Sequence, residues 1–417
     1  MRETKLIILV MCAVASAGCG GSTADFRRYE TFAHKVASDN SIKFTSQQRT
    51  DIDEALQALF GNPDEPTLPS IEGSEIGKLM SLTRLKLAAG PVGSDEQGRA
   101  QGLYREHCAH CHGITGDGAG PTAAFLNPYP RDYRKGQFKF KSTPVGQKPT
   151  HDDLKRIVLE GIAGTAMPSF KLLPDLEVEA LVDYVKYLSI RGEVERALIR
   201  ATVELEEGKR LVAVMGSDAT AELKAAQQEQ VAALKELVAG VVGRWEGAPA
   251  AVVSIPPPPE MSKEQLAESR MRGRALFYGT VANCVKCHGD SALGDGQMTD
   301  YDEWAKEFIV DGKDRNLVAA YESRGLLTPR NIRPRNLRLG VYRGGMRPID
   351  HYWRIKNGIE GTPMPAATMK PEGDPNAKGL TPDDIWDLVN YVRALPYEPI
   401  NNPLEAAGQA ENQRERL

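Results

Sequence analysis

The sequence predicts a mainly α-helical protein in which two related helical domains are joined by a helical linker. The first observation is an internal repeat. A Cys-x-x-Cys-His motif, a Pro-Arg turn, an octet ending in Met-Pro and an apolar helix follow one another in the same order twice. The second observation is the i, i+3, i+4, i+7 spacing of apolar residues in the helix that closes each copy, which is typical of an amphipathic helix. The third is the charged, Ala-rich stretch between the copies, which favours helix.

Three matched stretches define the repeat. Residues 130–138 (PRDYRKGQF) recur as 334–342 (PRNLRLGVY), and 161–168 (GIAGTAMP) recur as 358–365 (GIEGTPMP). The apolar faces of the closing helices match in Leu181, Val182, Tyr184, Val185 and Leu188 against Leu388, Val389, Tyr391, Val392 and Leu395. Because the matched stretches occur in the same order twice, they indicate a duplicated domain.

We expect six segments along the chain. They are a signal peptide (1–18), a polar and helical lead-in (19–90), a first domain (91–192), a helical and Pro-rich linker (193–260), a second domain (261–400) and a polar tail (401–417). In the lead-in, helical spacing from Thr45 to Phe60 predicts a helix with Thr45 as its cap. In the linker we expect helices over 193–214 and 219–242, packed on a neighbour or docking a partner, and then a stiff spacer at 256–259.

Composition excludes some classes of function. The 417 residues carry 52 Lys and Arg against 56 Asp and Glu, for a net charge of −4 and a pI near 6.1. A dedicated nucleic-acid binder usually has a basic surplus, so no nucleic-acid partner is expected. No apolar run reaches the roughly 18 residues that predict a membrane-spanning helix.

The N-terminus has the order of an export signal. Arg2 and Lys5 precede an apolar run over 6–15, and Ser16-Ala17-Gly18-Cys19 follows. Small residues ending in Cys resemble the bacterial lipoprotein signal, in which that Cys carries the lipid, although Ser16 stands where the pattern usually has Leu. We expect Cys19 to be lipid-bearing and to hold the protein at the periplasmic side of a membrane. The alternative is cleavage after Ala17, which would leave a soluble periplasmic protein.

The two Cys-x-x-Cys-His motifs predict covalent haem attachment. Two thiols on about one helical turn can bond both vinyl groups of one haem, and the next residue, a His, then reaches the iron. The predicted attachment residues are Cys108, Cys111, Cys284 and Cys287, and the predicted iron ligands are His112 and His288. A redox dithiol, a zinc site built from all four Cys, and two disulfides are weaker alternatives, because each leaves both His residues without a role.

Met167 and Met364 are the predicted sixth ligands. They occupy matched positions in the repeated octet, each preceded by Gly-Thr-x and followed by Pro. A thioether is a soft ligand suited to haem iron. The rivals in the second half have no counterpart in the first; they are Met298, Met346 and Met369. Five histidines also lack counterparts and are expected at the surface: His34, His107, His110, His151 and His351.

Arg131 and Arg335 are candidates for binding haem propionates. Each lies in the repeated Pro-Arg turn, and a guanidinium suits a carboxylate. A solvated loop arginine would fit the pattern nearly as well. Pro329-Arg330 offers a rival register for this turn in the second copy.

Residues 95–190 and 265–397 resemble tandem class I c-type cytochrome domains. The resemblance rests on Cys108, Cys111, His112 and Met167, on their counterparts in the second copy, on Gly-Asp-Gly at 116–118 and 294–296, and on the closing helix. It implies a small helical fold around each of two covalently bound haems c, with N- and C-terminal helices that cross. It also implies electron transfer outside the cytoplasm.

The function expected from these features is that of a dihaem electron carrier rather than an enzyme. Its partners would be redox proteins, such as a respiratory donor complex, a terminal oxidase or a dehydrogenase. An iron with both axial positions filled by protein has no open position for a substrate. The alternatives are a dihaem peroxidase-like enzyme, in which one iron must open to peroxide, and the cytochrome subunit of a dehydrogenase complex.

Overall fold

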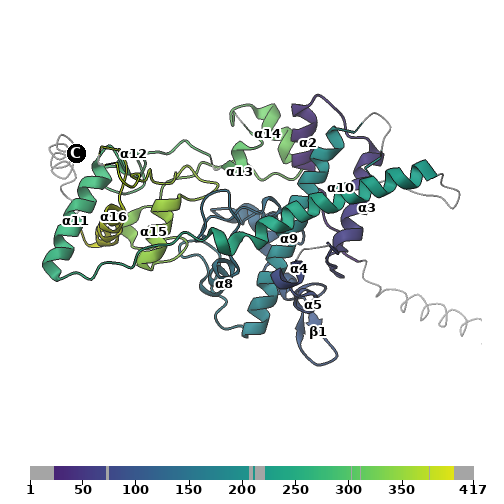
Figure 1. The fold of residues 1–417 in the computed structure, drawn as a ribbon, viewed down its shortest axis with the longest axis horizontal. Helices are drawn as coiled ribbons and strands as arrows, with labels where there is room; N and C mark the ends of the chain where they lie inside the picture. Colours follow the sequence, from purple (N-terminus) through teal and green to yellow (C-terminus); the bar gives the residue numbers. More distant parts are fainter. Residues whose placement is uncertain are drawn as a thin grey trace, which may run out of the picture.

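The computed structural model describes residues 23–71, 75–205, 210–211, 221–301, 303–309, 311–374 and 376–398. The predicted signal peptide, Cys19 and the tail from residue 401 lie outside these described residues. The described chain forms an elongated, mainly helical molecule, with the second repeat at one end and the lead-in helices toward the other (Figure 1). None of the described helices combines the length and the apolar character needed to cross a bilayer.

The lead-in is helical, as predicted. Its helices are α2 (Glu30–Asp39), α3 (Ser46–Phe60), α4 (Ile76–Leu79) and α5 (Leu82–Ala88). The predicted cap at Thr45 is confirmed, because its side chain accepts a hydrogen bond from the Gln48 amide while the Gln48 side chain accepts one from the Thr45 amide. The helix ends at Gly61, which has a φ of 69°, a conformation that glycine adopts at little cost.

The first repeat begins with a two-stranded hairpin. Its elements are β1 (Gly93–Ser94), β2 (Ala100–Gln101), α6 (Leu103–His107), α7 (Ala109–His112), η1 (Ala123–Phe125), η2 (Tyr133–Lys135), α8 (His151–Glu160) and α9 (Asp175–Val203). The linker helix expected to begin at Glu193 does not exist as a separate element, because α9 runs through that position without a break. A domain boundary at residue 192 would therefore cut a helix.

Gly192 lies inside α9 for a packing reason. A Cβ at this position would lie 2.3 Å from Arg134 Cα, so the glycine lets the η2 turn approach the helix backbone. The glycine therefore marks a close contact and not a helix end. The sequence offers no way to distinguish these two roles of an isolated glycine.

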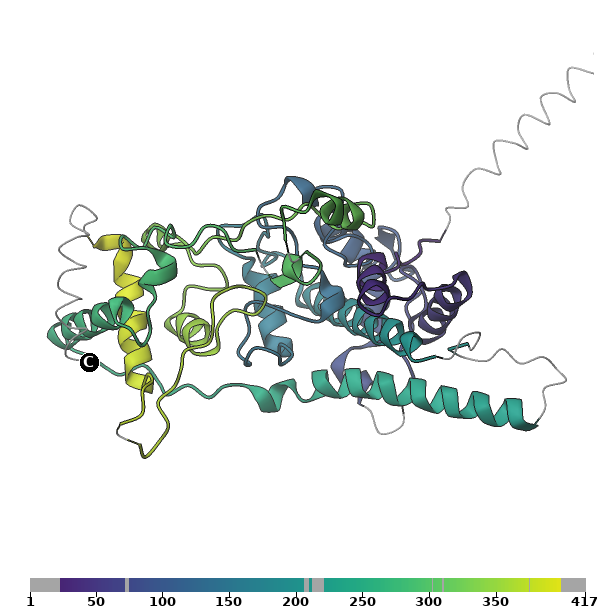
Figure 2. The same cartoon turned by 90° about the horizontal axis from the view of Figure 1, so that it is seen from above.

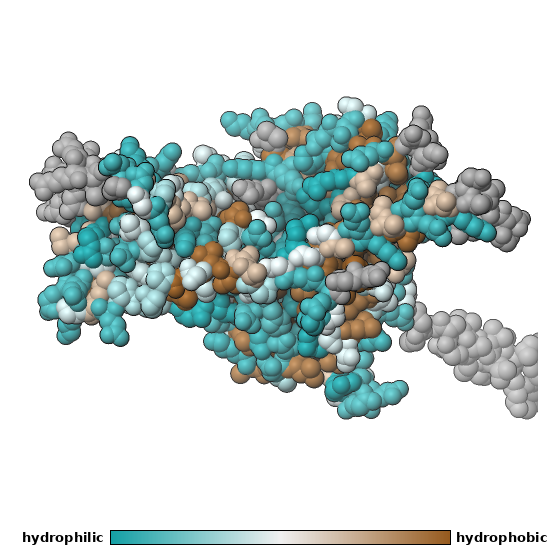
Figure 3. All heavy atoms as spheres, in the orientation of Figure 1, coloured by the Kyte–Doolittle hydropathy of each residue, from teal (hydrophilic) through white to brown (hydrophobic). Residues whose placement is uncertain are grey.

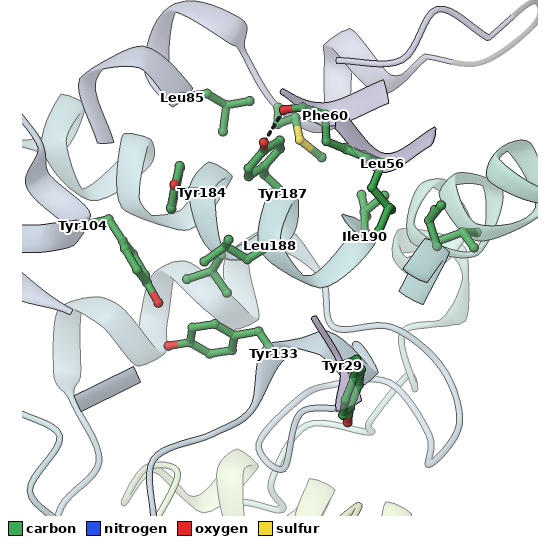
Figure 4. Close-up of a cluster of buried hydrophobic side chains, with 14 of the residues drawn as sticks. Tyr29, Leu56, Phe60, Leu85, Tyr104, Tyr133, Tyr184, Tyr187, Leu188 and Ile190 are labelled. Atoms are coloured by element: carbon green, nitrogen blue, oxygen red, sulfur yellow. Dashed lines mark hydrogen bonds between the residues drawn. The ribbon is translucent and has the colours of Figure 1, made fainter. Parts of the chain in front are cut away.

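Helix α9 is the centre of the larger hydrophobic core. It packs against α2, α3, α5, α8 and α10. Figure 4 shows its side chains among those of the lead-in, and the labelled residues are Tyr29, Leu56, Phe60, Leu85, Tyr104, Tyr133, Tyr184, Tyr187, Leu188 and Ile190. The Tyr187 hydroxyl donates a hydrogen bond to the Phe60 carbonyl across this core (Figure 4). The lead-in and the first repeat therefore share one core.

The linker contains one long helix, α10 (Ala221–Glu246), followed by η3 (Ala248–Ala251). Figure 2 shows α10 along one side of the molecule. Its C-terminal half packs through Val238, Val241, Val242 and Trp245, all buried, whereas Lys224 to Ala226 are exposed. The prediction of a packed helix is confirmed for this half.

The second repeat has its own smaller core. Its elements are α11 (Lys263–Tyr278), α12 (Val285–His288), α13 (Glu303–Lys306), α14 (Arg315–Glu322), η4 (Leu337–Leu339), α15 (Pro348–Asn357), α16 (Pro382–Ala394) and η5 (Leu395–Tyr397). Helices α11 and α16 cross at Gly273, where a Cβ would lie 2.0 Å from the Asp387 carbonyl oxygen. The crossing of N- and C-terminal helices that the resemblance implies is therefore present in this repeat.

An insertion in the second repeat returns to the first. This strap, residues 299–327, contributes Phe308, Ile309, Tyr321 and Leu326 to the core around α9. Its Glu307 forms ion pairs with Lys135 and Arg196, at 2.6 Å for the Arg196 pair. The strap thus joins the two repeats through both apolar and charged contacts.

Hydrophilic residues cover most of the molecular face shown in Figure 3, with smaller apolar areas between them.

Candidate haem site

Both attachment motifs form a single tight turn. In the first repeat the amides of Cys111 and His112 donate to the Cys108 carbonyl at 3.1 and 2.9 Å. In the second repeat the amides of Cys287 and His288 donate to Cys284 in the same way, at 3.2 and 2.9 Å. This places the two sulfurs of each motif within one turn and the histidine directly after them, as covalent attachment requires.

The first thiol of each motif is buried, and the four motif cysteines form no disulfide. Burial raises the pKa of both Cys108 and Cys284 to about 12, so neither is a thiolate near neutral pH. Within the described parts of the chain, no three His, Cys, Asp or Glu side chains come together in a way that could hold a metal ion. The four-Cys zinc alternative is therefore wrong for this geometry.

Each proximal histidine is held by a backbone carbonyl. His112 Nδ1 donates to the Arg131 carbonyl at 3.0 Å, and His288 Nδ1 donates to the Arg335 carbonyl at 3.1 Å. A proton on Nδ1 leaves the Nε2 lone pair available as a metal ligand. Burial lowers the pKa of His112 to about 4, so this ring is neutral near pH 7, and burial also lowers the pKa of His288.

These hydrogen bonds also establish the register of the Pro-Arg turn. Arg335 is the structural counterpart of Arg131, because each accepts the bond from its own histidine. The rival Arg330 instead donates to the carbonyls of Leu126 and Ala124, at 2.7 Å each.

The glycine loop after each histidine is matched in a different register from the one the sequence suggests. The Gly118 amide donates to the His112 carbonyl, and the Gly294 amide donates to the His288 carbonyl, both at 2.9 Å. Gly118 and Gly294 also lie against the carbonyls of Pro130 and Pro334. Gly118 and Gly294 each follow their histidine by six residues, so the Gly-Asp-Gly at 294–296 lies two residues further from its histidine than the one at 116–118 and is not its structural counterpart.

The two methionine loops have the same hydrogen bonds. Thr165 Oγ1 donates to the Ile162 carbonyl at 2.8 Å and accepts from the Met167 amide at 3.1 Å. Thr362 Oγ1 does the same with Ile359 and Met364, at 2.8 and 3.2 Å. The loop ends are also closed alike, since Ile162 and Ile359 donate to the methionine carbonyls at 3.1 Å. The sequence repeat therefore encodes a repeated loop conformation.

All of these groups face one cavity. A cavity of about 830 Å³ is lined by the four motif cysteines, both proximal histidines and both predicted methionines. The rival methionines Met298, Met346 and Met369 are not among the described residues that line the cavity. Met298 and Met346 are solvent-exposed. The two sites are thus not separate pockets; they open into each other between the repeats.

The cavity wall in the second repeat carries buried groups that lack partners. Arg343 Nε and His351 Nε2 are buried with no hydrogen-bond partner among the described residues. Arg335 and Arg354 line the same cavity. Burial lowers the pKa of Arg343, and it lowers the pKa of Arg354 to about 10, so Arg354 stays charged near neutral pH. The unpartnered N–H of Arg343 and the arginines of this wall fit a group that brings carboxylates, and a haem brings two propionates.

The expectation that His351 lies at the surface is wrong, because it is only 3% exposed and packs edge-on against Tyr342. Arg343 and Arg354 were missed altogether. One signal for Arg343 was present in the sequence, since residues 323–349 contain seven arginines and no acidic residue. Such a run needs anions from elsewhere, either from another part of the fold or from a ligand.

Two family models match the two repeats of the chain. Residues 95–185 match the family model of cytochrome c oxidase, cbb3-type, subunit III, and residues 271–396 match the family model of cytochrome c. No curated protein matches the chain. A chain of the reducing HAO-like protein complex of Kuenenia stuttgartiensis is similar to it at 22% identity and a TM-score of 0.45, over 73% of this chain and 98% of that one.

Proposed function

Because the chain belongs to the tandem class I c-type cytochromes, we propose that it is a dihaem electron carrier with two covalently bound haems c. Cys108 and Cys111 would hold one haem, and Cys284 and Cys287 the other. His112 with Met167, and His288 with Met364, would be the axial pairs. The observation that carries the proposal is the convergence of both complete ligand sets on one cavity.

A haem bound in such a site supplies an iron that accepts and releases one electron. The residues of the chain prepare for it in three ways. The Arg131 and Arg335 carbonyls orient the two histidine rings. The threonine-bridged loops hold the methionines without a helix around them. The arginines of the cavity wall, with Arg335 among them, would bind the propionates.

A carrier is favoured over a peroxidase-like enzyme by the equality of the two methionine loops. An enzyme would need one distal position open to peroxide, and a difference between the loops would mark it. The same hydrogen bonds hold both loops, and both methionines line the cavity. The match of the first domain to an oxidase subunit family supports a place among redox proteins, with a respiratory donor, a terminal oxidase or a dehydrogenase as partner.

Export and lipid attachment form a second part of the proposal. Haem c proteins of this family act outside the cytoplasm, and the first 19 residues have the order of a lipoprotein signal. Stable anchoring needs more than one acyl chain. Cys19→Ser should therefore move the protein from the membrane fraction to the soluble fraction. A wild-type protein that is already soluble and begins after Ala17 would contradict the anchor and leave the carrier role standing.

Mass spectrometry combined with optical spectra tests the haem assignment. The mature wild-type protein should carry two haem additions, and Cys111→Ala or Cys287→Ala should each remove one. The oxidised protein should show a near-infrared sulfur-to-iron band with the intensity of two methionine ligands. Met167→Ala and Met364→Ala should each halve this band, while Met298→Ala, at an exposed position, should leave it unchanged. Two haems with one high-spin iron and turnover of peroxide would favour the enzyme instead.

A further inference from the structure

The two repeats touch through a reciprocal contact of arginines with methionine loops. A Cβ built on Gly164, in the first methionine loop, would lie 2.6 Å from Nη2 and 3.1 Å from Cζ of Arg335, which belongs to the second repeat. A Cβ built on Gly361, in the second loop, would lie 3.7 Å from Nη1 of Arg131, which belongs to the first repeat. Each guanidinium therefore lies against the methionine loop of the other repeat.

The same two arginines hold the proximal histidines of their own repeats. The Arg335 carbonyl accepts a hydrogen bond from His288, while its side chain reaches the loop of Met167. The Arg131 carbonyl accepts from His112, while its side chain reaches the loop of Met364. One residue thus connects the proximal side of one site with the distal side of the other, in both directions.

The two contacts are not equally strong. The Arg335 guanidinium is fixed from behind, because its Nε donates to the Val341 carbonyl at 2.8 Å, and it lies directly on the Gly164 backbone. The second methionine loop has an additional cross-repeat support, a buried ion pair between Glu360 and Lys141. The position equivalent to Glu360 in the first loop is Ala163, which can form no such pair. The first loop therefore depends more on its arginine than the second does.

We propose that Arg335 is a positioning residue for Met167, and that Arg131 has the weaker reciprocal role for Met364. The proposal rests on the His/Met ligation put forward above. It makes the two sites one coupled unit, because a shift of the Arg335 backbone with His288 also moves the side chain that supports the Met167 loop. If each arginine supported only the methionine loop of its own repeat, Arg131 would instead act on Met167 and Arg335 on Met364.

The test isolates one methionine signal at a time. In a Met364→His background, Met167 is the only source of the sulfur-to-iron band. Adding Arg335→Gln should then reduce this band by half or more, or shift it measurably, with two haems still present by mass. Arg131→Gln in the same background is the matched control, since the Arg131 side chain faces the other loop, and the Met167 band should persist. Arg335→Lys should give an intermediate loss, because lysine keeps the charge but lacks the planar fork.

A second pair of variants reaches the same contact without removing an arginine. Gly164→Ala and Gly361→Ala impose a similar backbone strain, since φ is 72° and 69° at the two positions. Only Gly164→Ala also displaces a guanidinium. It should therefore weaken the Met167 band at least twice as much as Gly361→Ala weakens the Met364 band.

The outcomes separate this proposal from the proposed function. A Met167 band that is present in the Met364→His parent and unchanged by Arg335→Gln overturns the cross-repeat role and leaves the carrier standing. A band that responds to Arg131→Gln as much as to Arg335→Gln also overturns it. The absence of any band in the parent would contradict both the ligation and the positioning role.

Discussion

The two repeats share the parts that face the cavity and differ in the parts that support them. The hydrogen bonds of their histidines and methionine loops have equivalent partners and nearly equal distances. Their scaffolds are not alike. The first repeat uses the 29-residue helix α9 within a core built from the lead-in, whereas the second uses the 13-residue helix α16 crossed by α11. After duplication, the chemistry of attachment constrains only the cavity face, so the opposite face can acquire different packing.

The first prediction concerns the close crossing of α11 and α16 in the second repeat. Gly273→Ala should destabilise the second repeat by about 3 kcal/mol, because its Cβ meets backbone that cannot move aside. A thermal melt of the holoprotein followed by circular dichroism should show the loss. Gly240→Ala in α10 is the matched control, since a Cβ there meets no atom within 4 Å, and helix propensity should raise stability by about 0.5–1 kcal/mol. Equal effects of the two variants would contradict the crossing.

The second prediction concerns the strap between the repeats. Glu307→Gln should cost about 2–3 kcal/mol, because it leaves Lys135 and Arg196 without their buried counter-charge. The unfolding midpoint in urea measures this cost. The control is Lys306→Gln, whose half-exposed partner Asp300 lies 3.7 Å away and should matter little.

The same carboxylate predicts an acid dependence. Burial raises the pKa of Glu307, but Lys135 and Arg196 outweigh that effect and leave the pKa below its ordinary value. The contribution to stability is therefore complete above the ordinary glutamate range and is lost as the pH falls through the lowered pKa. The stability difference between the wild type and Glu307→Gln should shrink on acidification below pH of about 4. A difference that stays constant down to acid pH would contradict the ion pairs.

The third prediction concerns a contact present only in the first repeat. The His112 ring stacks on Tyr133 at 4.7 Å with a 16° tilt, whereas the position equivalent to Tyr133 in the second repeat is Leu337. Tyr133→Leu should make the first repeat resemble the second and cost about 1 kcal/mol of stability. Tyr133→Phe keeps the stacked ring and should be nearly neutral. Thermal melts followed by circular dichroism compare the two, and equal losses would show that stacking is not what stabilises this site.

The fourth prediction concerns what the repeats share. Thr165→Val and Thr362→Val each remove a hydroxyl that bridges a methionine loop, with little change of shape. Each should cost about 1 kcal/mol, because the methionine amide loses its acceptor. The two costs should agree closely if the loops are equivalent. If the unfolding midpoint falls twice as far in one variant as in the other, the surroundings of the loop, and not the shared hydrogen bonds, determine its stability.

The attachment motifs, the methionine loops and the capped helix at Thr45 could be predicted because each depends on residues close together in the chain. The errors occurred where distant contacts decide. The helix expected over 193–214 is in part the continuation of α9, in which Gly192 lets the backbone of Arg134 pack closely. His351 is buried because Tyr342 and the cavity surround it. The glycine register shifted by two residues because hydrogen bonds to His112 and His288, and not residue identity, define the equivalent positions.

The sequence by itself predicted which residues each site would use. Covalent attachment needs two thiols and a histidine within one helical turn, and a repeated octet encodes a repeated loop, so these signals are local. Only the tertiary structure decided that the two sites open into one cavity, that the strap joins the repeats, and that Arg335 lies on the loop of Met167. Arg335 and Gly164 are 171 residues apart in the chain, and no periodicity or spacing reports a contact of that kind. It arises only from the way in which two complete domains pack, which depends on the shape and charge of whole surfaces.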